Sequence, residues 1–407
     1  MSRFMAALCA LALLAGSGRC FAQGWLDSLE SDLKLSNPSG SISSQMTVLL
    51  DLEGYASDVR APGLIYDDQP FLNPRATFYI DTMLVRHFYS FVQARVDRGF
   101  DPGSQDGDAR LDEYLLRWTP LDTPALNVQF GKFATVVGNW VQRHDSWENP
   151  LITPPLPYSG LTTVKDGNVP RSPWWFLWNR DYAADKDEWL PVVWGPSYAT
   201  GWSVFGSIGK FDYAFEIKNA SLSSRPGEWA LNNNMWETPT YSGRLGFRPS
   251  PAWNSGISLS VGPYLSTEAK SFLPLRKGLN DYDEIVLDYD LSYAWHHWEF
   301  WAEFFFTRFQ APNVGNADVF TYYLEAKYKI TPQLFIAARW NQQVFGSVKT
   351  RRGNHETWDR NVIQPEVALG YRFNRHWQAK VQYSFSHRES TVQQGEHMFA
   401  GQVTLKF

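Results

Sequence analysis

Phe399-Ala400-Gly401-Gln402-Val403-Thr404-Leu405-Lys406-Phe407 stands at the carboxyl end of the chain, and its side chains alternate in polarity. Successive side chains of a β-strand point to opposite faces. One face therefore carries Phe399, Val403, Leu405 and Phe407, and the other carries Gln402, Thr404 and Lys406. The stretch predicts an amphipathic strand with a terminal aromatic residue. A soluble barrel and a membrane barrel both accommodate such a strand, so the rest of the chain decides between them.

The same alternation recurs along the chain and predicts about sixteen strands, with fourteen and eighteen kept as alternatives. The expected strands are 42–53, 76–85, 88–97, 111–118, 126–133, 202–208, 211–220, 241–248, 256–265, 284–293, 297–309, 320–330, 334–344, 363–373, 377–387 and 399–407. Their connections alternate between short turns and long loops. With an even strand number, both termini and the short turns are expected on the periplasmic side, and the long loops outside.

Composition distinguishes a membrane barrel from a soluble sandwich. The chain is polar on average, with a mean hydropathy of -0.35, yet it is 16% aromatic and holds 19 Trp. Alternating strands dilute hydropathy, and aromatic residues gather at both lipid–water interfaces of a barrel. We therefore expect an all-β, transmembrane antiparallel barrel whose apolar face meets lipid and lipopolysaccharide. The net charge of -5 argues against nucleic acid as a partner.

The amino terminus has the pattern of a secretory signal peptide. Basic Arg3 precedes an apolar run over 4–15, and Ala22 supplies a small residue before an expected cut. A lipoprotein signal is not supported, because Arg19 stands directly before Cys20. Residues 1–22 are thus expected to be cleaved off as the signal peptide. Cys9 and Cys20, the chain's two cysteines, leave with them, which excludes disulfides and thiolate sites from the mature chain.

The remaining chain divides into two parts. Residues 23–40 are expected to form a periplasmic segment, with a short amphipathic helix over Gly24 to Pro38, and residues 41–407 form the barrel. The barrel pattern is interrupted at 134–200, a segment rich in Pro and Trp. Loops this long inside a compact domain are usually functional. This loop either folds into the lumen or caps the barrel outside, and the sequence favours neither.

Catalytic chemistry is not indicated. The chain lacks the His-Glu-x-x-His, phosphate-loop and Gly-x-Ser-x-Gly motifs. His144-Asp145-Ser146 holds the residue types of a catalytic triad, but three adjacent residues do not orient as a triad requires. We expect no enzyme activity, no cofactor and no metal.

The predicted lumen is polar and of mixed charge. Inward cations are expected at Arg95, Arg117, Lys218, Arg244, Arg248, Lys327, Lys329, Arg339, Arg372 and Lys380. Charges facing a water-filled channel set its selectivity. The candidate constriction residues are Lys132, Arg143, Lys165, Arg171, Arg180, Arg117, Arg339, Glu303 and Glu325. For Trp174, Trp175 and Trp178 we expect one of two roles, packing within the loop or stacking on the rings of bound sugars. Because the cations form no uninterrupted ladder, a strongly anion-selective pore is not expected.

The whole pattern resembles the porin superfamily. Within it, the hairpin Leu116-Arg117-Trp118-Thr119-Pro120, followed by Asn127-Val128-Gln129-Phe130-Gly131-Lys132-Phe133 and Gly138, is similar to the phosphate-selective porin O and P type. The resemblance implies a passive channel for small hydrophilic solutes or ions and a homotrimer. Phosphate specificity is not carried over. The alternative is a plugged, non-conducting barrel that serves surface assembly or polysaccharide binding.

Overall fold

The structure is a computed structural model that describes residues 21–59, 63–65, 70–98, 108–181, 186–227, 234–390 and 394–407. The expected signal peptide lies almost wholly outside the described residues, and its cleavage after Ala22 stays a prediction. Within the described part of the chain, sixteen antiparallel strands form one closed barrel. The prediction of an all-β barrel with sixteen strands is confirmed, and the alternatives of fourteen and eighteen are wrong.

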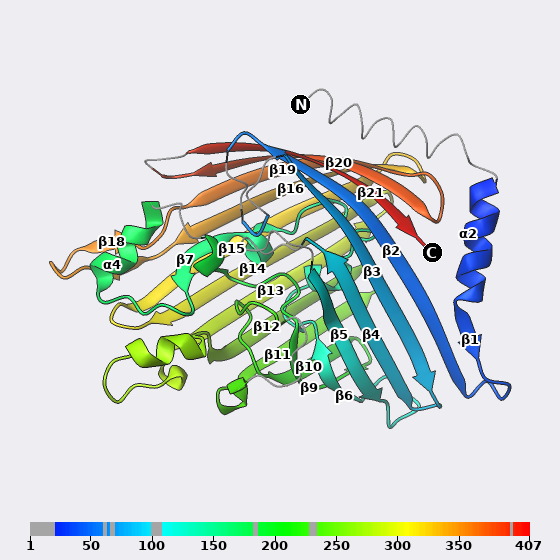
Figure 1. Ribbon diagram of the computed structural model, residues 1–407, viewed down its shortest axis with the longest axis horizontal. Helices are drawn as coiled ribbons and strands as arrows, with labels where there is room; N and C mark the ends of the chain where they lie inside the picture. Colours follow the sequence, from blue (N-terminus) through cyan, green and yellow to red (C-terminus); the bar gives the residue numbers. More distant parts are fainter. Residues whose placement is uncertain are drawn as a thin grey trace.

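Each barrel strand pairs antiparallel with the next (Figure 1). In order they are β2 (Ile42–Ser57), β3 (Phe71–Leu84), β4 (Phe88–Asp97), β5 (Asp108–Trp118), β6 (Asn127–Phe133), β9 (Ala199–Ile208), β10 (Phe211–Lys218), β11 (Thr240–Ser250), β12 (Trp253–Pro263), β13 (Asp283–Trp295), β14 (Trp298–Ala311), β15 (Gly315–Lys329), β16 (Leu334–Phe345), β19 (Val362–Arg372), β20 (Trp377–Arg388) and β21 (Gly395–Lys406). β21 pairs with β2 from Leu49 opposite Lys406 to Ser57 opposite Met398, which closes the barrel.

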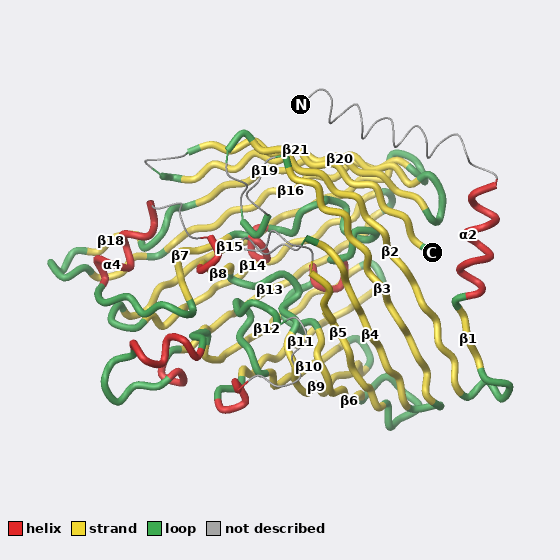
Figure 2. Tube along the Cα trace, in the orientation of Figure 1, coloured by secondary structure: helices red, strands yellow, loops and turns green. Residues whose placement is uncertain are grey.

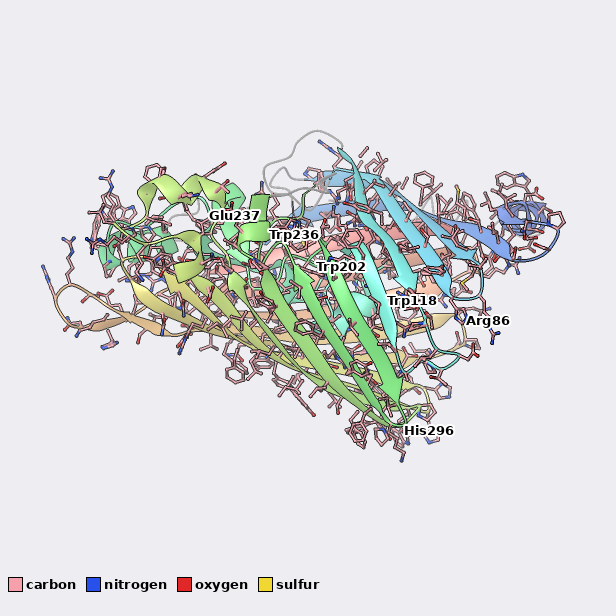
Figure 3. The ribbon with its side chains drawn as sticks, turned by 90° about the horizontal axis from the view of Figure 1, so that it is seen from below. Arg86, Trp118, Trp202, Trp236, Glu237 and His296 are labelled. Carbon is pink, nitrogen blue, oxygen red and sulfur yellow. The ribbon has the colours of Figure 1, made fainter. Side chains whose placement is uncertain are left out.

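The alternation places apolar side chains outside and polar ones inside. On β15, Leu324 is 46% exposed, whereas its neighbour Glu325 is 3% exposed and points inward. Figure 3 shows Trp118 and Trp202 on the outer surface of the wall, and the Trp202 ring lies 4.5 Å from that of Phe130. Exposed aromatic side chains on the outer surface are the pattern that a lipid-facing wall requires.

Short turns and long loops lie at opposite ends of the barrel. Gly209-Lys210 joins β9 to β10 directly, with Ile208 opposite Phe211 and a φ of 62° at Gly209. His296 lies in the β13–β14 turn, and Figure 3 shows it at the same end of the barrel as Arg86. Trp236 and Glu237 lie toward the other end, in the long β10–β11 connection. The predicted rhythm of short and long connections is present.

A helix stands at the short-turn end. α2 (Phe21–Asp32) covers part of the segment where a helix was expected, and β1 (Lys34–Ser36) then pairs with the first residues of β2. Figure 1 places α2 beside the carboxyl terminus. Asp27 of α2 accepts hydrogen bonds from Arg375 Nε at 2.8 Å and from His376 Nε2 at 2.7 Å. The pKa of Asp27 is lowered, chiefly by the His376 hydrogen bond and also by Arg375.

The connections also contain short elements, many of them inside the barrel or at its end opposite α2 (Figure 2). These are α3 (Leu156–Ser159), α4 (Pro173–Trp178), the pair β7 (Leu161–Lys165) and β8 (Trp189–Pro191), the pair β17 (Ser347–Lys349) and β18 (His355–Thr357), and 3-10 helices at Trp140–Arg143, Asn179–Asp181, Lys186–Glu188, Asn234–Glu237, Thr267–Phe272 and Leu279–Asp281. No helix among the described residues is both long and apolar enough to span a bilayer.

Part of the loop at 134–200 folds into the lumen, whereas its α4 lies at the end of the barrel opposite α2 (Figure 1), so the loop combines the two arrangements that the sequence left open. Tyr158 and Val193 from the loop are fully buried in one cluster with Phe305 and Tyr323, which point inward from β14 and β15. The Tyr158 ring meets that of Phe305 edge-on at 5.6 Å. The loop therefore has an apolar core of its own, part of which is supplied by the barrel wall.

Candidate functional site

The entrance of the loop is bound by one carboxylate. Glu303 on β14 accepts the backbone N–H of Asn139 at 2.8 Å and of Trp140 at 2.5 Å, together with the hydroxyls of Tyr158 and Tyr323. Gly138 precedes this turn with a φ of +85°, and a Cβ there would lie 1.9 Å from Tyr158 Oη. A glycine is therefore required where the chain enters the lumen.

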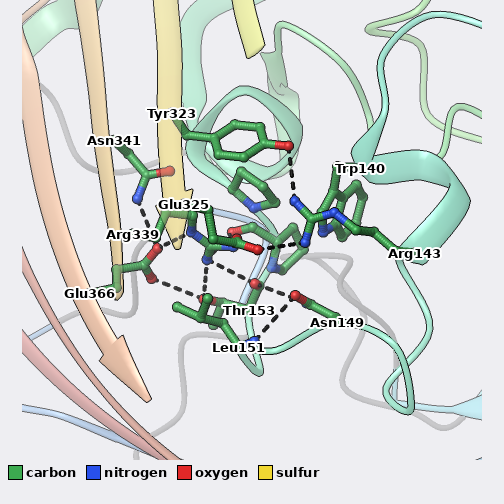
Figure 4. Close-up of polar contacts among 12 residues, drawn as sticks. Trp140, Arg143, Asn149, Leu151, Thr153, Tyr323, Glu325, Arg339, Asn341 and Glu366 are labelled. Carbon is green, nitrogen blue, oxygen red and sulfur yellow. Dashed lines mark hydrogen bonds and ion pairs between the residues drawn. The ribbon is translucent and has the colours of Figure 1, made fainter. Parts of the chain in front are cut away.

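A chain of charges fixes the middle of the loop (Figure 4). Arg143 donates to Glu325 at 2.6 Å, and its Cζ stands 4.3 Å from the Trp301 ring centre. Arg339 joins Glu325 at 3.2 Å to Glu366 at 2.6 Å. The same guanidinium donates to the loop carbonyl of Thr153 at 2.9 Å. Every member is buried, so these ions pair with one another rather than with solvent.

Polar side chains of β16 and β20 also bind the loop backbone. Gln382 Oε1 accepts the N–H of Ile152 at 2.6 Å and of Thr153 at 3.2 Å. Asn341 Oδ1 accepts the N–H of Leu156 at 3.0 Å. Lys380 Nζ donates to the carbonyls of Ser146, Asn149 and Leu151 at 2.7, 2.9 and 3.1 Å. These bonds satisfy backbone groups that have no secondary-structure partner. The loop is thus bound along the wall from β14 to β20.

A cavity of about 150 Å³ remains on the other side of the loop. Its wall side carries Arg75, Arg95 and Arg110 from the consecutive strands β3, β4 and β5. Its loop side carries Trp140, His144, Ser146, Asn149, Tyr158 and Tyr198 among others. A water needs about 10–15 Å³ of such space, so the cavity has room for about ten waters.

The three arginines present their charge to this cavity, and Asp112 lines it beside them. Arg95 and Arg110 stand directly opposite each other across β4 and β5, and both pair with Asp112, at 2.6 and 3.1 Å. Arg75 pairs with Asp51 at 3.1 Å and with Glu53. The arginine side chains are 9–16% exposed, whereas these carboxylates are 0–2% exposed. A solute in the cavity therefore meets the three guanidinium groups together with the carboxylate of Asp112, while Asp97 pairs with Arg95 and Arg110 at 3.7 and 3.3 Å.

This row of arginines was expected only in part, and Asp97 and Asp112 lie among its side chains. Of the three, only Arg95 was recognised as inward-facing, because the expected strands began at 76 and 111. β3 and β5 in fact begin at Phe71 and Asp108 and include the other two. A bulge also shifts the register, since Gln93 pairs with Glu113 and Ala94 with Leu111. A bulge places two residues opposite one, which breaks strict alternation.

The predicted constriction residues fall into separate places. Arg143, Arg339, Glu303 and Glu325 come together in the buried seam between loop and wall. Lys132 instead donates to the carbonyls of Leu111, at 2.6 Å, and Gly227. Arg117 donates to Gln129 at 3.1 Å within the wall and stacks near the Tyr89 ring. The role of all these residues at a constriction stays a prediction.

The remaining candidates lie at the end of the barrel opposite to α2. Lys165 pairs with Glu188, and Arg180 pairs with Glu356 of β18 at 3.0 Å. Arg171 and the three tryptophans of α4 line a separate groove, described below. Figure 1 shows α4 and β18 together at that end. The structure thus separates these residues from the buried seam.

The triad-like sequence is not arranged as a triad. His144 Nδ1 lies 2.6 Å from the carbonyl of Val141, and its Nε2 lies 2.8 Å from Tyr198 Oη. Asp145 accepts the hydroxyl of Tyr79 at 2.6 Å. Both imidazole nitrogens are therefore engaged by groups other than Ser146. Across the described residues, no group of three or more His, Cys, Asp or Glu side chains is arranged to hold a metal ion.

Comparisons with known proteins identify the fold. No protein-family model matches the chain, and no curated protein matches it in sequence. Among solved structures, it is similar to the outer membrane channel DcaP of Acinetobacter baumannii, with a TM-score of 0.57 and 10% identity over 92% of this chain and 99% of that one. It is also similar to an anion-selective porin from Comamonas acidovorans, with a TM-score of 0.53 and 10% identity over 90% of this chain and 100% of that one.

A trimeric form of OmpT, an outer membrane protein of Vibrio cholerae, has the same architecture, with a TM-score of 0.55 and 8% identity over 90% of this chain and 100% of that one. At such low identities the likeness shows the fold alone. The chain thus has a porin-like barrel of sixteen strands. None of these three neighbours is described as a phosphate-selective porin, so that finer resemblance stays a prediction.

Proposed function

We propose that the protein is an outer-membrane channel for passive diffusion of small hydrophilic solutes, with a preference for anions. The observation that carries this proposal is the cavity between the loop and the arginines of β3, β4 and β5. The loop is bound to β16 and β20 on the opposite half of the wall and touches the arginine side at Tyr79, so the space that remains lies mainly on the arginine side. The porin-like fold and the described outer-membrane neighbours support the channel role and the location.

Selectivity in this proposal comes from the wall potential. Guanidinium groups offer fixed donors to carboxylate, phosphate or chloride, and they keep their charge at every physiological pH. Across about 5 Å of water, one unit charge changes the energy of a passing ion by about 0.8 kcal/mol, which is about fourfold in local concentration. The acids paired with Arg75, Arg95 and Arg110 reduce this preference, and Asp112 reaches the cavity, but their side chains are less exposed than those of the arginines.

Reversal potentials in a salt gradient test the proposal. Purified protein in a planar bilayer is expected to give open-channel steps with chloride preferred over potassium. Removing two charges in R95Q/R110Q should lower the chloride concentration beside the wall about sixteenfold, at about fourfold per charge, and should lower the chloride-to-potassium permeability ratio by at least that factor. R95K/R110K keeps the charge and should retain the preference. Arg308→Gln, at an exposed ion pair with Asp318, is the matched control and should change nothing. Unchanged selectivity in R95Q/R110Q would refute the role of these arginines.

A plugged barrel for surface assembly or polysaccharide binding is the second candidate. It is supported by the dense packing of the lumen, where Glu303, Arg339 and Asp288 are all buried. The same bilayer recordings separate the two functions. A folded protein that gives no conductance steps at any voltage favours the plugged barrel.

The assembly state and the membrane partners belong to the proposal as well. The outward apolar strands would contact lipid and lipopolysaccharide, and both termini would be periplasmic. A homotrimer is proposed on the resemblance to porins and on the trimeric neighbour. Native mass spectrometry from detergent micelles is expected to give three chains per particle, and a monomer at all detergent concentrations would contradict it.

A further inference from the structure

A groove of about 860 Å³ lies between α4 and the β17–β18 hairpin, at the end of the barrel away from α2 and the carboxyl terminus (Figure 1). It is outside the lumen seam and the arginine-walled cavity, and the channel proposal makes no use of it. Its lining includes Trp174, Trp175, Trp178, Arg171, Arg351 and Arg352. Aromatic faces and cations thus meet in one surface depression.

The three tryptophans of α4 face the groove, and other residues of α4 pack the helix against the protein. They are 52%, 49% and 53% exposed, and the Trp174 ring lies 4.9 Å from that of Trp175 and 5.0 Å from that of Trp178. Phe176 and Leu177 anchor the helix instead, with the Phe176 ring 5.7 Å from buried Trp358. A contiguous exposed aromatic patch of this kind marks an interaction site.

The cations of the groove have little internal compensation. Among the described residues that line the groove, Glu356 is the sole acid, and Arg180 binds it at 3.0 Å while also donating to the carbonyl of Thr357 at 2.8 Å. That contact ties the hairpin to the region of α4. Arg171, Arg351 and Arg352 are exposed and have no hydrogen bond or ion pair with the described residues. Three guanidinium groups are therefore available to a ligand.

A second depression of about 430 Å³ adjoins the first and shares Arg171 and Trp175 with it. Lys165 and Asn168 line this extension. The continuous surface is therefore longer than a single ligand unit such as one sugar ring. The extension also adds hydrogen-bond donors along its length. An elongated site with repeated aromatic and cationic contacts suits a chain-like ligand.

We propose that this groove binds an anionic saccharide chain, with sugar rings stacked on the tryptophans and their carboxylate or phosphate groups held by Arg171, Arg351 and Arg352. The C–H face of a pyranose packs on the flat indole, and guanidinium groups bind carboxylate and phosphate through two parallel hydrogen bonds. A lipid tail would leave these cations unpaired. This inference uses the proposed orientation, which exposes the groove outside the cell, and does not depend on conduction.

Two sources present this chemistry, a free acidic polysaccharide and the anionic core sugars of lipopolysaccharide. The test titrates purified protein in detergent micelles with oligogalacturonate, with lipid-free lipopolysaccharide core oligosaccharide and with neutral maltoheptaose, and follows binding by calorimetry. At least one anionic probe should bind about tenfold more tightly than maltoheptaose, and salt should weaken it. The tighter of the two anionic probes identifies the source.

Two groove variants examine the two contact types separately. W174A/W178A removes the stacking surface, and R351Q/R352Q removes cations; each should raise Kd for the bound probe about tenfold. Trp236→Ala and Arg308→Gln change an exposed tryptophan and an exposed arginine outside the groove lining and should leave Kd unchanged. All variants must show the same heat-dependent gel shift as the parent barrel.

The outcomes are decisive in either direction. Loss of binding in both groove variants with intact controls supports the site. The proposal is overturned if neither anionic probe binds, if maltoheptaose binds equally well, or if the groove variants bind like the parent. Conductance of the same variants is expected to stay at the parent level, which keeps this result separate from the channel experiment.

Discussion

Replacing Arg339 by Met is expected to release residues 151–158 from the barrel wall while the barrel stays folded. Arg339 has a fully buried side chain, and it joins Glu325 to Glu366. It also donates to the loop carbonyls of Thr153 at 2.9 Å and Pro154 at 3.1 Å. Methionine keeps much of the volume but removes the charge and every one of these donors. In the docked state Glu366 would then be left without its cation, whereas Glu325 would keep its ion pair with Arg143 at 2.6 Å.

The size of the effect follows from that arrangement. Removing one partner of a buried ion pair costs about 3–5 kcal/mol, because the other charge remains without compensation. Water can reach the lumen when the loop moves, so the lower end of that range applies. A cost of about 3 kcal/mol corresponds to about a 150-fold shift from docked to undocked loop. The strands keep their backbone hydrogen bonds in either state, which confines the change to the loop.

Amide hydrogen exchange measures this equilibrium directly. The N–H groups of Ile152, Thr153 and Leu156 are bound by side chains of β20 and β16 and exchange only when the loop undocks. In R339M their exchange should accelerate about 150-fold, while amides within β15 keep their rates. Mass spectrometry of peptides spanning 151–158 reports the change.

Two comparisons make this prediction refutable. Arg308→Met removes an exposed guanidinium from Asp318 and should not affect residues 151–158. Adding E366Q to R339M removes the uncompensated charge, while Glu325 keeps its pair with Arg143, and should restore most of the slow exchange. Unchanged exchange over 151–158 in a folded R339M barrel would refute the view that this arginine holds the loop.

The remaining predictions concern the loop entrance and the short-turn end. Gly138→Ala should lower stability by about 1–3 kcal/mol in urea titrations followed by gel mobility, because a Cβ meets Tyr158 Oη and the backbone has positive φ. Gly353→Ala, with a φ of +86° and open space around it, should cost less, and equal losses would argue against the contact. The lowered pKa of Asp27 stabilises α2 docking above the usual aspartate range, and this contribution is lost as pH falls through the lowered value. D27N should speed α2 amide exchange at neutral pH about two- to fivefold and remove its response to acid; an unaltered pH response would contradict the assignment.

Local alternation was sufficient to predict the barrel, because the order of polar and apolar residues within each strand indicates which face meets lipid. β4 was expected at 88–97 and lies at Phe88–Asp97, and β16 was expected to start at 334 and does so. Lys380 was expected inside and Val381 outside, and they are 2% and 52% exposed. In a barrel wall, the lipid face is repeated often enough for the pattern to exceed the noise of single residues.

The site was less predictable because its contacts join residues far apart in sequence. Glu303 meets Asn139 and Gln382 meets Ile152, and no local pattern indicates such partners. Arg75 and Arg110 were missed at strand ends, where alternation is read over too few residues. Asp112 is buried, and Glu113 accepts the N–H of loop residue Ala134 at 3.1 Å, so both face inward next to the bulge, which a strict period of two does not allow.

Arginines on the two halves of the lumen have different roles, one structural and one in ion selectivity, and experiments can separate these two roles. Arg339 forms ion pairs with wall acids and donates to a loop carbonyl, so its charge stabilises the docked loop. Arg95 bonds to acids on its own wall and keeps part of its surface toward the cavity. Loosening the loop with R339M should therefore raise conductance with little change in ion preference, whereas R95Q/R110Q should change preference and leave exchange over 151–158 slow. If one variant altered both properties equally, the division of the lumen into a holding side and a conducting side would be wrong.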